Sequence, residues 1–585
     1  MDIYSLNIHE IQGGYNSCTG YQKEDGWNKR KQDQLGFENW EEIDSFCSKY
    51  GFYQENISEK TAYLSRYEAP PPLHGQDPQP PRLSNTLGNY QGSTSFLPIM
   101  ETAKPGNIQQ VRAATPVETK REEEPSSCLA SFELLSNYAS GFKKPRGEKD
   151  SNRGHNVSLD GRKLSTEEIM RLAGERYIEF SSQRVDDPFM VMHPYSSDFS
   201  GLSVEQTRDV ELAHLLLAAA EKVGYQQFER ASRLLDGCHR LASNTGSPAQ
   251  RIVFYFTEAL RERISRETGS FRSRRMERKE KYSMPCLAMS SNPVFLKCHQ
   301  ELPFAQATVF AGIQAIVENV ALKTKIHLID LQIRSGVQWA VLIQALADRV
   351  SRPIEHLKIT ALGTIDGQMM EETGRTLGEF ARSLNLPFSF NVVLLSDMKD
   401  LSKEHLEIEA GEAVVVYSQS ILRSMISRPD CLESVMRVIR RLNPCIMVVV
   451  EVEANHNSPS FFNRFTEALF FYSALFDCLE DCTDRDSQYR FILEGVYFGD
   501  GINNTVAAEG EERLNRNVKL NVWRAFFARY GMVEIGLSES ALYQANLIIK
   551  QFACGNSCTL DSDGKCLIVG WKGTPIHSLS IWKFN

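Results

Sequence analysis

The chain has 585 residues, with 65 Lys and Arg against 74 Asp and Glu, so its formal net charge is −9. An acidic chain lacks the broad positive field that non-specific coating of nucleic acid requires. The 13 Cys are odd in number and scattered, which argues against a disulfide framework and favours a reducing compartment. We expect no secretory signal, because the first residues lack a basic and then apolar pattern. Apolar runs such as 446–450 are far shorter than the roughly 20 residues of a membrane span.

The first 160 residues are polar and Pro-rich, and no helical or strand period persists there. Such a segment cannot bury enough apolar surface to offset its chain entropy, so we expect 1–160 to be a disordered regulatory region. Within it, Phe37, Trp40 and Ile43 are three residues apart and flanked by acidic residues. This pattern is typical of a helix that folds into a partner's groove, and equally of a helix that packs on the main domain.

Helical patterns follow. Ser165 and Glu168 have the spacing of a capping box, within a segment 161–204 that we expect to be a helical linker. Periodic apolar residues predict helices over 209–223 and 225–238, and a third that begins at Pro248. Short joints between these helices predict a bundle, so we assign 205–324 to a mainly helical cap region.

From residue 325, short apolar runs alternate with helix-length segments. The predicted strands are 325–331, 357–363, 388–394, 413–417 and 445–451, and the predicted helices between them include 337–346, 371–383 and 431–442. Near-continuous apolar strands that alternate with helices indicate a parallel sheet covered on both faces. Right-handed crossovers then give a doubly wound arrangement.

The last residues predict an antiparallel end to this sheet. A short strand over 532–535 and a helix over 541–552 precede a hairpin over 559–571 that turns at Asp563 and Gly564. This layout is typical of methyltransferase-type Rossmann folds. The predicted fold class is therefore α/β, with a methyltransferase-like Rossmann core over 325–585, an α-helical cap and a long disordered N-terminal region.

Several segments, taken in chain order, resemble the motifs of the plant GRAS family of transcriptional regulators. The strand at 326–330 resembles the VHIID motif, the region from Pro387 corresponds to the PFYRE motif, and 451–477 is a long match. The ends 570–571 and 580–582 resemble the SAW motif. The residues that carry the resemblance are Ile326, His327, Leu328, Ile329, Asp330, Pro387, Arg464, Trp571 and Trp582. The match covers about 205–585, and its departures, Leu328 and Ile581, are apolar exchanges that we place in the core.

The resemblance implies a nuclear transcriptional regulator or co-regulator that assembles with other GRAS proteins, as homodimers or heterodimers, and with DNA-binding transcription factors. It implies a role in plant development or symbiosis signalling, and the general character of the sequence suggests the arbuscule-development type of mycorrhizal symbiosis. The sequence DELLA does not occur, so the gibberellin-sensing subgroup is not supported. The family's leucine-rich helices imply candidate partner-binding residues, with a cap core as the alternative interpretation: Leu212, Leu215, Leu216, Leu234 and Leu235.

The alternative function is an S-adenosylmethionine-dependent small-molecule methyltransferase, which needs a glycine-rich turn after its first strand. Here the turn has one glycine, Gly336, and the bulky Gln332, Ile333 and Arg334 occupy the places of the others. We therefore expect no enzyme, no cofactor and no catalytic residue. We expect Asp330 to cap the following helix and fix the turn, and His327 to be a hydrogen-bonded core histidine.

Two further groups of residues have open interpretations. Cys554 and Cys558, with Cys566 and His577, could gather around zinc, as could Cys478 and Cys482. Their spacing is not that of a known zinc finger, so we expect buried or free thiols and no metal.

Two basic clusters are candidates for nuclear import or for contact with DNA phosphates, and a solvated loop is the alternative for both. The clusters consist of Lys143, Lys144 and Arg146, and of Arg272, Arg274, Arg275, Arg278 and Lys279. Direct DNA contact is a candidate role, but the absence of a visible base-reading motif argues against it.

Overall fold

A computed structural model describes residues 164–182, 202–269, 292–364 and 367–585. The predicted disordered region 1–160 and the aromatic helix at 37–46 lie outside the described residues. So do both basic clusters, from Lys143 to Arg146 and from Arg272 to Lys279. These assignments stay predictions.

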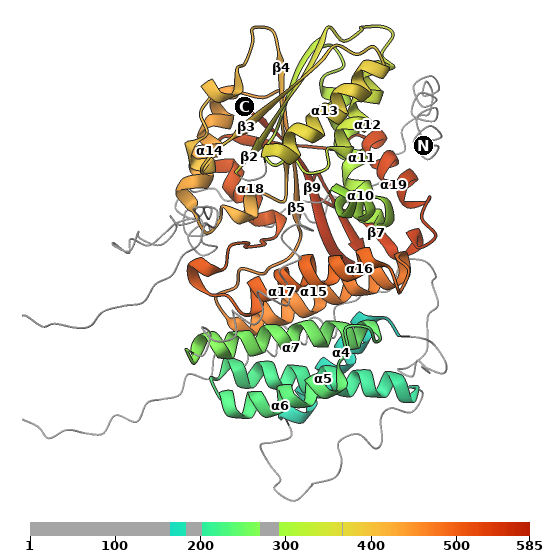
Figure 1. The fold of residues 1–585 in the computed structure, drawn as a ribbon, viewed down its shortest axis with the longest axis vertical. Coiled ribbons are helices and arrows are strands. Elements are labelled where there is room, and N and C mark those ends of the chain that lie inside the picture. Colours follow the sequence, from blue (N-terminus) through green and yellow to red (C-terminus); the bar gives the residue numbers. More distant parts are fainter. Residues whose placement is uncertain (1–163, 183–201, 270–291, 365–366) are drawn as a thin grey trace, which may run out of the picture. The chain divides into compact units, whose positions relative to one another are not determined.

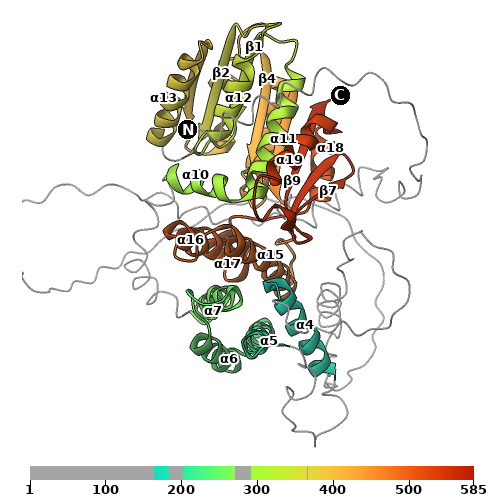
Figure 2. The same ribbon diagram turned by 90° about the vertical axis from the view of Figure 1, so that its right-hand side faces the viewer.

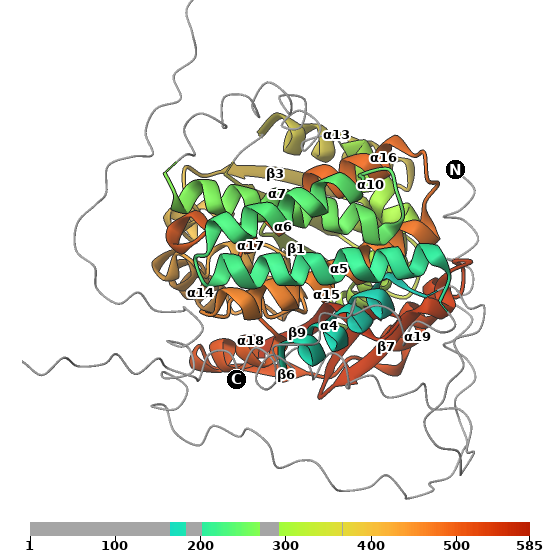
Figure 3. The same cartoon turned by 90° about the horizontal axis from the view of Figure 1, so that it is seen from below.

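Four described helices form what we call the cap: α4 (Thr166–Ser182), α5 (Val204–Gly224), α6 (Phe228–Leu241) and α7 (Pro248–Glu267). The predicted capping box is present, because Glu168 N donates to Ser165 Oγ at 3.2 Å and Ser165 N donates to Glu168 Oε2 at 2.8 Å. Pro248 lies in the first turn of α7, as predicted. Figure 3 shows α5, α6 and α7 side by side, with α4 oblique to them. The three helices predicted from periodicity are thus confirmed.

The described part of the core contains one sheet of nine strands. Their bounds are β1 (Lys325–Asp330), β2 (His356–Gly363), β3 (Phe388–Leu394), β4 (Ala413–Gln419), β5 (Ile446–Val452), β6 (Met532–Ile535), β7 (Cys558–Asp563), β8 (Cys566–Trp571) and β9 (Thr574–Phe584). The order across the sheet is β3-β2-β1-β4-β5-β9-β8-β7, and β6 pairs with β9. Figure 2 shows β2, β1 and β4 side by side in this order. The five strands predicted as a parallel sheet do form one, which confirms the α/β fold class.

Helices cover both faces of the sheet. The helices of the described core are α10 (Asn292–Glu301), α11 (Pro303–Asn319), α12 (Val337–Ala347), α13 (Gly367–Ser383), α14 (Pro429–Leu442), α15 (Phe461–Cys482), α16 (Gln488–Ile492), the π-helical η5 (Leu493–Phe498), α17 (Gly499–Val506), α18 (Leu520–Arg529) and α19 (Glu539–Ile549), of which α15, α16 and α17 lie between the sheet and the cap. Figure 1 shows α11, α12, α13 and α19 on one side of the sheet and α14 and α18 on the other. Side chains alternate along each strand. Val448 and Val450 of β5 therefore pack in the core beneath α11, and Met447 and Val449 pack in the core beneath α14 and α18.

The antiparallel end of the sheet differs from the prediction in one respect. The hairpin of β7 and β8 forms around Gly564 as expected, but it does not pair with β5. The C-terminal strand β9, which was not predicted, lies between them and pairs with both β5 and β8. Its signal is weak because Ser578 and Ser580 occupy buried positions of the strand.

Helix α11 was also not predicted. Almost every residue from Pro303 to Ile316 is buried, because α11 contacts β5, β8 and β9 on one side and α12 and α19 on the other. A helix that is apolar on all sides has no amphipathic period to detect. Although residues 303–319 fall in the region assigned from the sequence to the cap, they belong to the layer that covers the sheet.

The cap is joined to the core by ion pairs, of which Arg251–Glu494 is fully buried. Helix α7 contacts α15 and α17, and its Arg251 has no exposed surface. Arg251 Nε donates to Glu494 Oε1 at 3.1 Å, and its Nη1 donates to Glu480 Oε2 at 2.9 Å. Further along α7, Arg263 Nη1 lies 2.7 Å from Glu509 Oε1, a carboxylate that also accepts from Arg464 of α15. Charged contacts therefore bind α7 to the segment after α15.

Candidate functional site

The candidate site is the junction between β1 and β4. The chain runs from β1 outward to β2 and β3, and then returns to place β4 and β5 on the other side of β1. In open doubly wound sheets, ligands bind outside the carboxyl ends of the strands at this point of reversal. Any nucleotide-like ligand would therefore meet the turn after β1.

That turn is organised around the buried carboxylate of Asp330. Its Oδ1 accepts from Gln332 N at 3.0 Å, and its Oδ2 accepts from Trp339 Nε1 at 2.9 Å. Burial raises the pKa of Asp330 to about 6, although these hydrogen bonds act to lower it. Asp330 fixes the turn as predicted, but it does not cap α12. The N-cap residue is Gly336, and no side chain caps the helix.

The remainder of the turn leaves no cradle for a cofactor. Gly336 has a φ of +67°, and a Cβ built on it would lie 2.6 Å from Thr373 Cγ2. Ile333 is only 3% exposed and belongs to the main apolar core. The sequence of this turn has one glycine among bulky residues. In the structure, α13 and the side chain of Ile333 cover the backbone of the turn.

Polar and charged residues at the carboxyl ends of β4 and β5 have hydrogen-bond partners within the protein. Glu451 Oε1 accepts from Leu422 N at 3.1 Å, and burial raises the pKa of Glu451 to about 7. Arg423 Nη1 donates to Asn517 Oδ1 at 3.0 Å, and Asn517 Nδ2 lies 2.9 Å from His456 Nδ1. Burial, together with the positive charge of Arg423, lowers the pKa of His456 to about 3. This group is a buried polar network within the protein.

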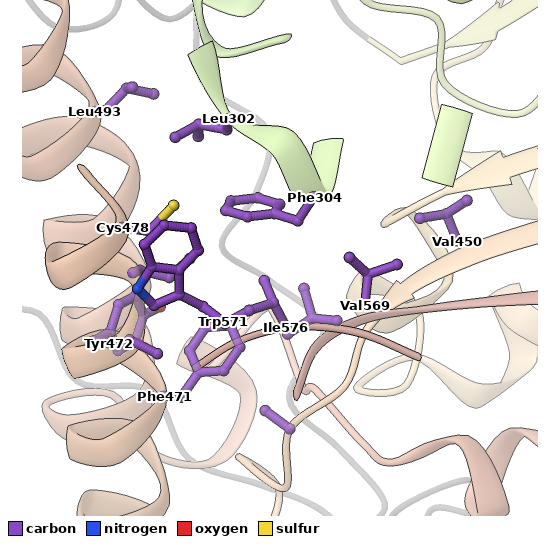
Figure 4. Close-up of a cluster of buried hydrophobic side chains, with 14 of the residues drawn as sticks. Leu302, Phe304, Val450, Phe471, Tyr472, Cys478, Leu493, Val569, Trp571 and Ile576 are labelled. Atoms are coloured by element: carbon purple, nitrogen blue, oxygen red, sulfur yellow. The ribbon is translucent and has the colours of Figure 1, made fainter. Parts of the chain in front are cut away.

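An apolar cluster packs beside the carboxyl end of β5 (Figure 4). It joins Leu302 and Phe304, at the start of α11, to Trp571 and Ile576 at the turn between β8 and β9. Trp571 is fully buried, and its Nε1 donates to Asp477 Oδ2 of α15 at 2.9 Å. Side chains from α11, α15 and the C-terminal strands thereby occupy this side of the sheet.

S-adenosylmethionine does not fit the residues at this junction, because the turn is closed at Gly336 and Ile333. A cavity of about 630 Å³ does lie on the core, but along the edge strand β3. It is lined by residues of α13, β3 and the loop beyond, including Arg375, Phe390 and Glu407. Since β2 separates β3 from β1, this cavity is not at the junction.

The five leucines proposed for partner binding divide into two groups. Leu212, Leu216 and Leu235 are at most 2% exposed and form the core of the cap. Leu215 and Leu234 are partly buried and pack against that core. A Cβ added at Gly237 would lie 2.9 Å from Leu215 Cδ2, so Leu215 fills the space between α5 and α6. The alternative interpretation, a cap core, describes three of the five side chains in this chain.

The motif residues outside the turn are mostly structural. Ile326, Leu328 and Ile329 are buried in β1, and His327 lies 2.9 Å from Glu412 Oε2 through Nδ1 and 2.8 Å from Thr360 Oγ1 through Nε2. His327 is therefore the hydrogen-bonded core histidine that was predicted.

The remaining three motif residues lie at the edges of elements. The carbonyl of Pro387 accepts from Leu357 N at 2.9 Å. Arg464 is 1% exposed, and its Nη1 donates to the carbonyl of Ser458 at 2.8 Å. Trp582 Nε1 donates to Ser580 Oγ at 2.9 Å, a contact within the terminal motif itself.

The structure groups the cysteines differently from either pairing considered in the sequence. Cys566 contacts Glu534, and His577 packs against the ring of Phe304. Neither joins Cys554, whose Sγ instead lies 2.8 Å from Cys482 Sγ. Among the described residues, no group of three or more His, Cys, Asp or Glu side chains has the arrangement of a metal site.

Sequence reasoning missed the residues that join distant segments. Arg251 and Glu494 are 243 positions apart, and Asp477 accepts from Thr166 N, 311 positions away, as well as from Trp571. The one sequence signal for these contacts is that Arg251 lies within the apolar face of a predicted helix. A charged residue at such a position indicates a buried partner of opposite charge. No described helix is long and apolar enough to cross a membrane.

Comparisons with known proteins agree with this fold. The sequence model of the GRAS domain family matches residues 212–583. The DELLA protein RGL1 of Arabidopsis thaliana is 33% identical over 383 residues, which cover 65% of this chain and 71% of that protein. DELLA protein 1 of Medicago truncatula is 30% identical over 430 residues, which cover 69% of this chain and 68% of that protein. The crystal structure of SCL7 from Oryza sativa superimposes with a TM-score of 0.55 at 25% identity, covering 64% of this chain and 99% of that one.

The fold and these matches define the class of protein: an α/β chain with a helical cap and a closed Rossmann-type junction. The chain belongs to the GRAS domain family. Its relatives support a role in transcriptional regulation.

Proposed function

We propose that this chain regulates transcription in the nucleus by assembling with other GRAS proteins and with DNA-binding transcription factors, in plant development or symbiosis signalling. The observation that carries the proposal is the closed turn after β1 in a member of this family. A Rossmann-type sheet whose ligand turn is filled by Ile333 and crowded at Gly336 can still present partner surfaces.

A pairing surface needs side chains that the chain itself leaves exposed. Helices α5 and α6 are joined by three residues, so they run antiparallel, and the start of α5 lies near the end of α6. Val204 is 71% exposed and Leu241 is 61% exposed at this end of the cap. We therefore assign pairing to the end of the cap marked by Val204 and Leu241, together with the partly buried Leu234.

Co-purification of two differently tagged copies of the full chain tests this assignment. The double variant Val204→Asp and Leu241→Asp should lose pairing while its circular dichroism stays unchanged. Leu322→Asp is the matched control, because Leu322 is also 71% exposed but follows α11 in the core. Pairing that survives the double variant, or that is lost equally in the control, would contradict the assignment. Leu216→Asp is unsuitable, since it would place a charge in the cap core.

Nuclear action rests on the family and on the two basic clusters outside the described residues. Alanine at Lys143, Lys144 and Arg146 should reduce nuclear accumulation of a fluorescent fusion if that cluster is read by an importer. Alanine at Arg272, Arg274, Arg275, Arg278 and Lys279 tests the second cluster in the same way. Unchanged distribution in both variants and in their combination would refute import through these residues.

A further inference from the structure

Four cysteines from two distant segments lie close together beneath the cap. Cys478 and Cys482 are one turn apart at the end of α15, and their Sγ atoms are 3.7 Å apart. Cys482 Sγ is also 2.8 Å from Cys554 Sγ, across 72 positions of sequence. Cys558 begins β7 four residues after Cys554. The sequence analysis treated Cys478 and Cys482 separately from Cys554 and Cys558. In the structure these four cysteines form one cluster.

The turn before β7 holds Cys554 against α15. Gly555 N donates to the carbonyl of Phe552 at 2.9 Å, and Ser557 N donates to the carbonyl of Cys554 at 2.9 Å. A Cβ on Gly555 would lie 2.1 Å from the carbonyl oxygen of Ile549, so this turn approaches α19 as only glycine allows. The position of Cys554 is therefore set by backbone contacts on both sides.

The cluster has an inner and an outer part. Cys478 has no exposed surface, and Figure 4 shows it beside Trp571 in the apolar cluster. Cys482, Cys554 and Cys558 are partly exposed. A cavity of about 430 Å³ is bordered by Gly555, Asn556 and Cys558, so a small oxidant can reach this turn from solvent. Oxidation should therefore begin at the outer thiols.

The thiols of the close pair are chemically unequal. Hydrogen bonds from the Cys478 and Cys554 thiols lower the pKa of Cys482, although its burial and the nearby carboxylates of Asp481 and Glu301 act in the opposite direction. Burial raises the pKa of Cys554 to about 12. Because the thiolate is the nucleophile, Cys482 is the sulfur that reacts first.

We propose that Cys482 and Cys554 form a reversible disulfide when the protein meets hydrogen peroxide. The Cys482 thiolate attacks one peroxide oxygen, the O–O bond breaks, and the leaving hydroxide takes up a proton to form water. The resulting sulfenic acid is attacked by the Cys554 sulfur, which loses its proton, and a second water leaves as the S–S bond forms. Two thiols are oxidised and one peroxide is reduced to two waters. A dithiol reductant reverses the step by thiol–disulfide exchange.

The bond would tie the end of α15 to the C-terminal strands. Since α15 also contacts α4, α5 and α7, the oxidised protein should hold the base of the cap more firmly. An upward shift in the melting temperature of the oxidised full chain, reversed by dithiothreitol, is the expected physical consequence.

Peptide mapping of the full chain tests the proposal. The reduced protein is treated with hydrogen peroxide, free thiols are blocked with N-ethylmaleimide, and digests are analysed by mass spectrometry with and without dithiothreitol. We expect a reducible cross-link between the peptides that contain Cys482 and Cys554. It should be absent in Cys482→Ala and in Cys554→Ala. Its formation should be several-fold slower in Cys478→Ala, because the thiolate loses a hydrogen-bond donor.

Cys431→Ala is the matched control, because Cys431 is buried beside Asp397 on the other face of the sheet and should leave the rate unchanged. Three results would overturn the proposal. One is peroxide treatment that converts Cys482 to sulfinic acid without a cross-link in the native chain. Another is a dominant bond between Cys554 and Cys558. The third is stoichiometric zinc in the purified chain that is lost in Cys482→Ala, since metal ligation would hold these thiols instead.

Discussion

Arg251 of the cap and Glu494 of the core are both fully buried and are joined by a hydrogen bond of 3.1 Å from Arg251 Nε to Glu494 Oε1. Glu480 and Arg490 extend the contact, with Glu480 Oε2 2.9 Å from Arg251 Nη1 and 3.4 Å from Arg490 Nη1. Burial raises the pKa of Glu494 to about 7, while the two arginines act to lower it. The attachment of the cap therefore includes one charged pair, Arg251 and Glu494, with no exposed surface.

Replacing Arg251 with Met should destabilise the protein by about 3–5 kcal/mol, because it leaves buried carboxylates without their main partner. Urea unfolding of the purified chain measures the effect. Arg261→Met is the matched control on the same helix: Arg261 pairs with Asp236 at 2.6 Å, but Asp236 is 61% exposed. Such a surface pair contributes about 1 kcal/mol or less. Equal losses in the two variants would show that the buried network does not hold the cap.

Glu451 should make stability depend on pH. Its pKa is about 7 in the folded chain against 4.5 for the ordinary group, so the folded state holds this proton more tightly than the unfolded state does. The stabilising contribution is complete below pH 4.5 and is lost as the pH rises through 7. This difference in pKa corresponds to about 3 kcal/mol.

The variant Glu451→Gln mimics the protonated side chain and should remove this dependence. Relative to the variant, the native chain should lose about 3 kcal/mol of unfolding free energy between pH 4.5 and pH 8. Glu355, which is exposed and directly precedes β2, provides the control variant Glu355→Gln. Parallel profiles for the native chain and Glu451→Gln would disprove the raised pKa.

Trp339→Phe should expose the role of Asp330 in the turn. The substitution keeps a ring against Tyr417, whose centroid is 4.8 Å away, but removes the donor to Asp330 Oδ2. The loss should be about 1–3 kcal/mol. It should be larger at pH 8 than at pH 5, since the missing hydrogen bond stabilises the charged carboxylate. A double-mutant cycle with Asp330→Asn measures the coupling, and strictly additive losses would refute it.

Local sequence patterns predicted much of this fold. The spacing of Ser165 and Glu168 identified a helix start, and the apolar run ending at Asp330 identified β1, because capping and strand alternation act over a few residues. The hairpin at Gly564 was equally local. Strand β9 was missed because Ser578 and Ser580 are buried by pairing partners more than a hundred residues away, such as Val449.

Less of the candidate site than of the fold could be predicted from the sequence. The missing glycines around Ile333 predicted a turn occupied by side chains, and Ile333 is buried there, but nothing local indicated that Thr373 of α13 lies close to Gly336. The periodicity of Leu212 and Leu216 identified an apolar face without showing what covers it. The neighbouring helices of the same chain do so. Likewise, no spacing rule brings Cys482 to Cys554.

The central claim is that the turn after β1 in this Rossmann-type core does not bind a cofactor. Calorimetric titration of the full chain with S-adenosylmethionine tests this claim most directly. We expect no saturable heat. Saturable binding in the micromolar range would contradict it and favour a methyltransferase.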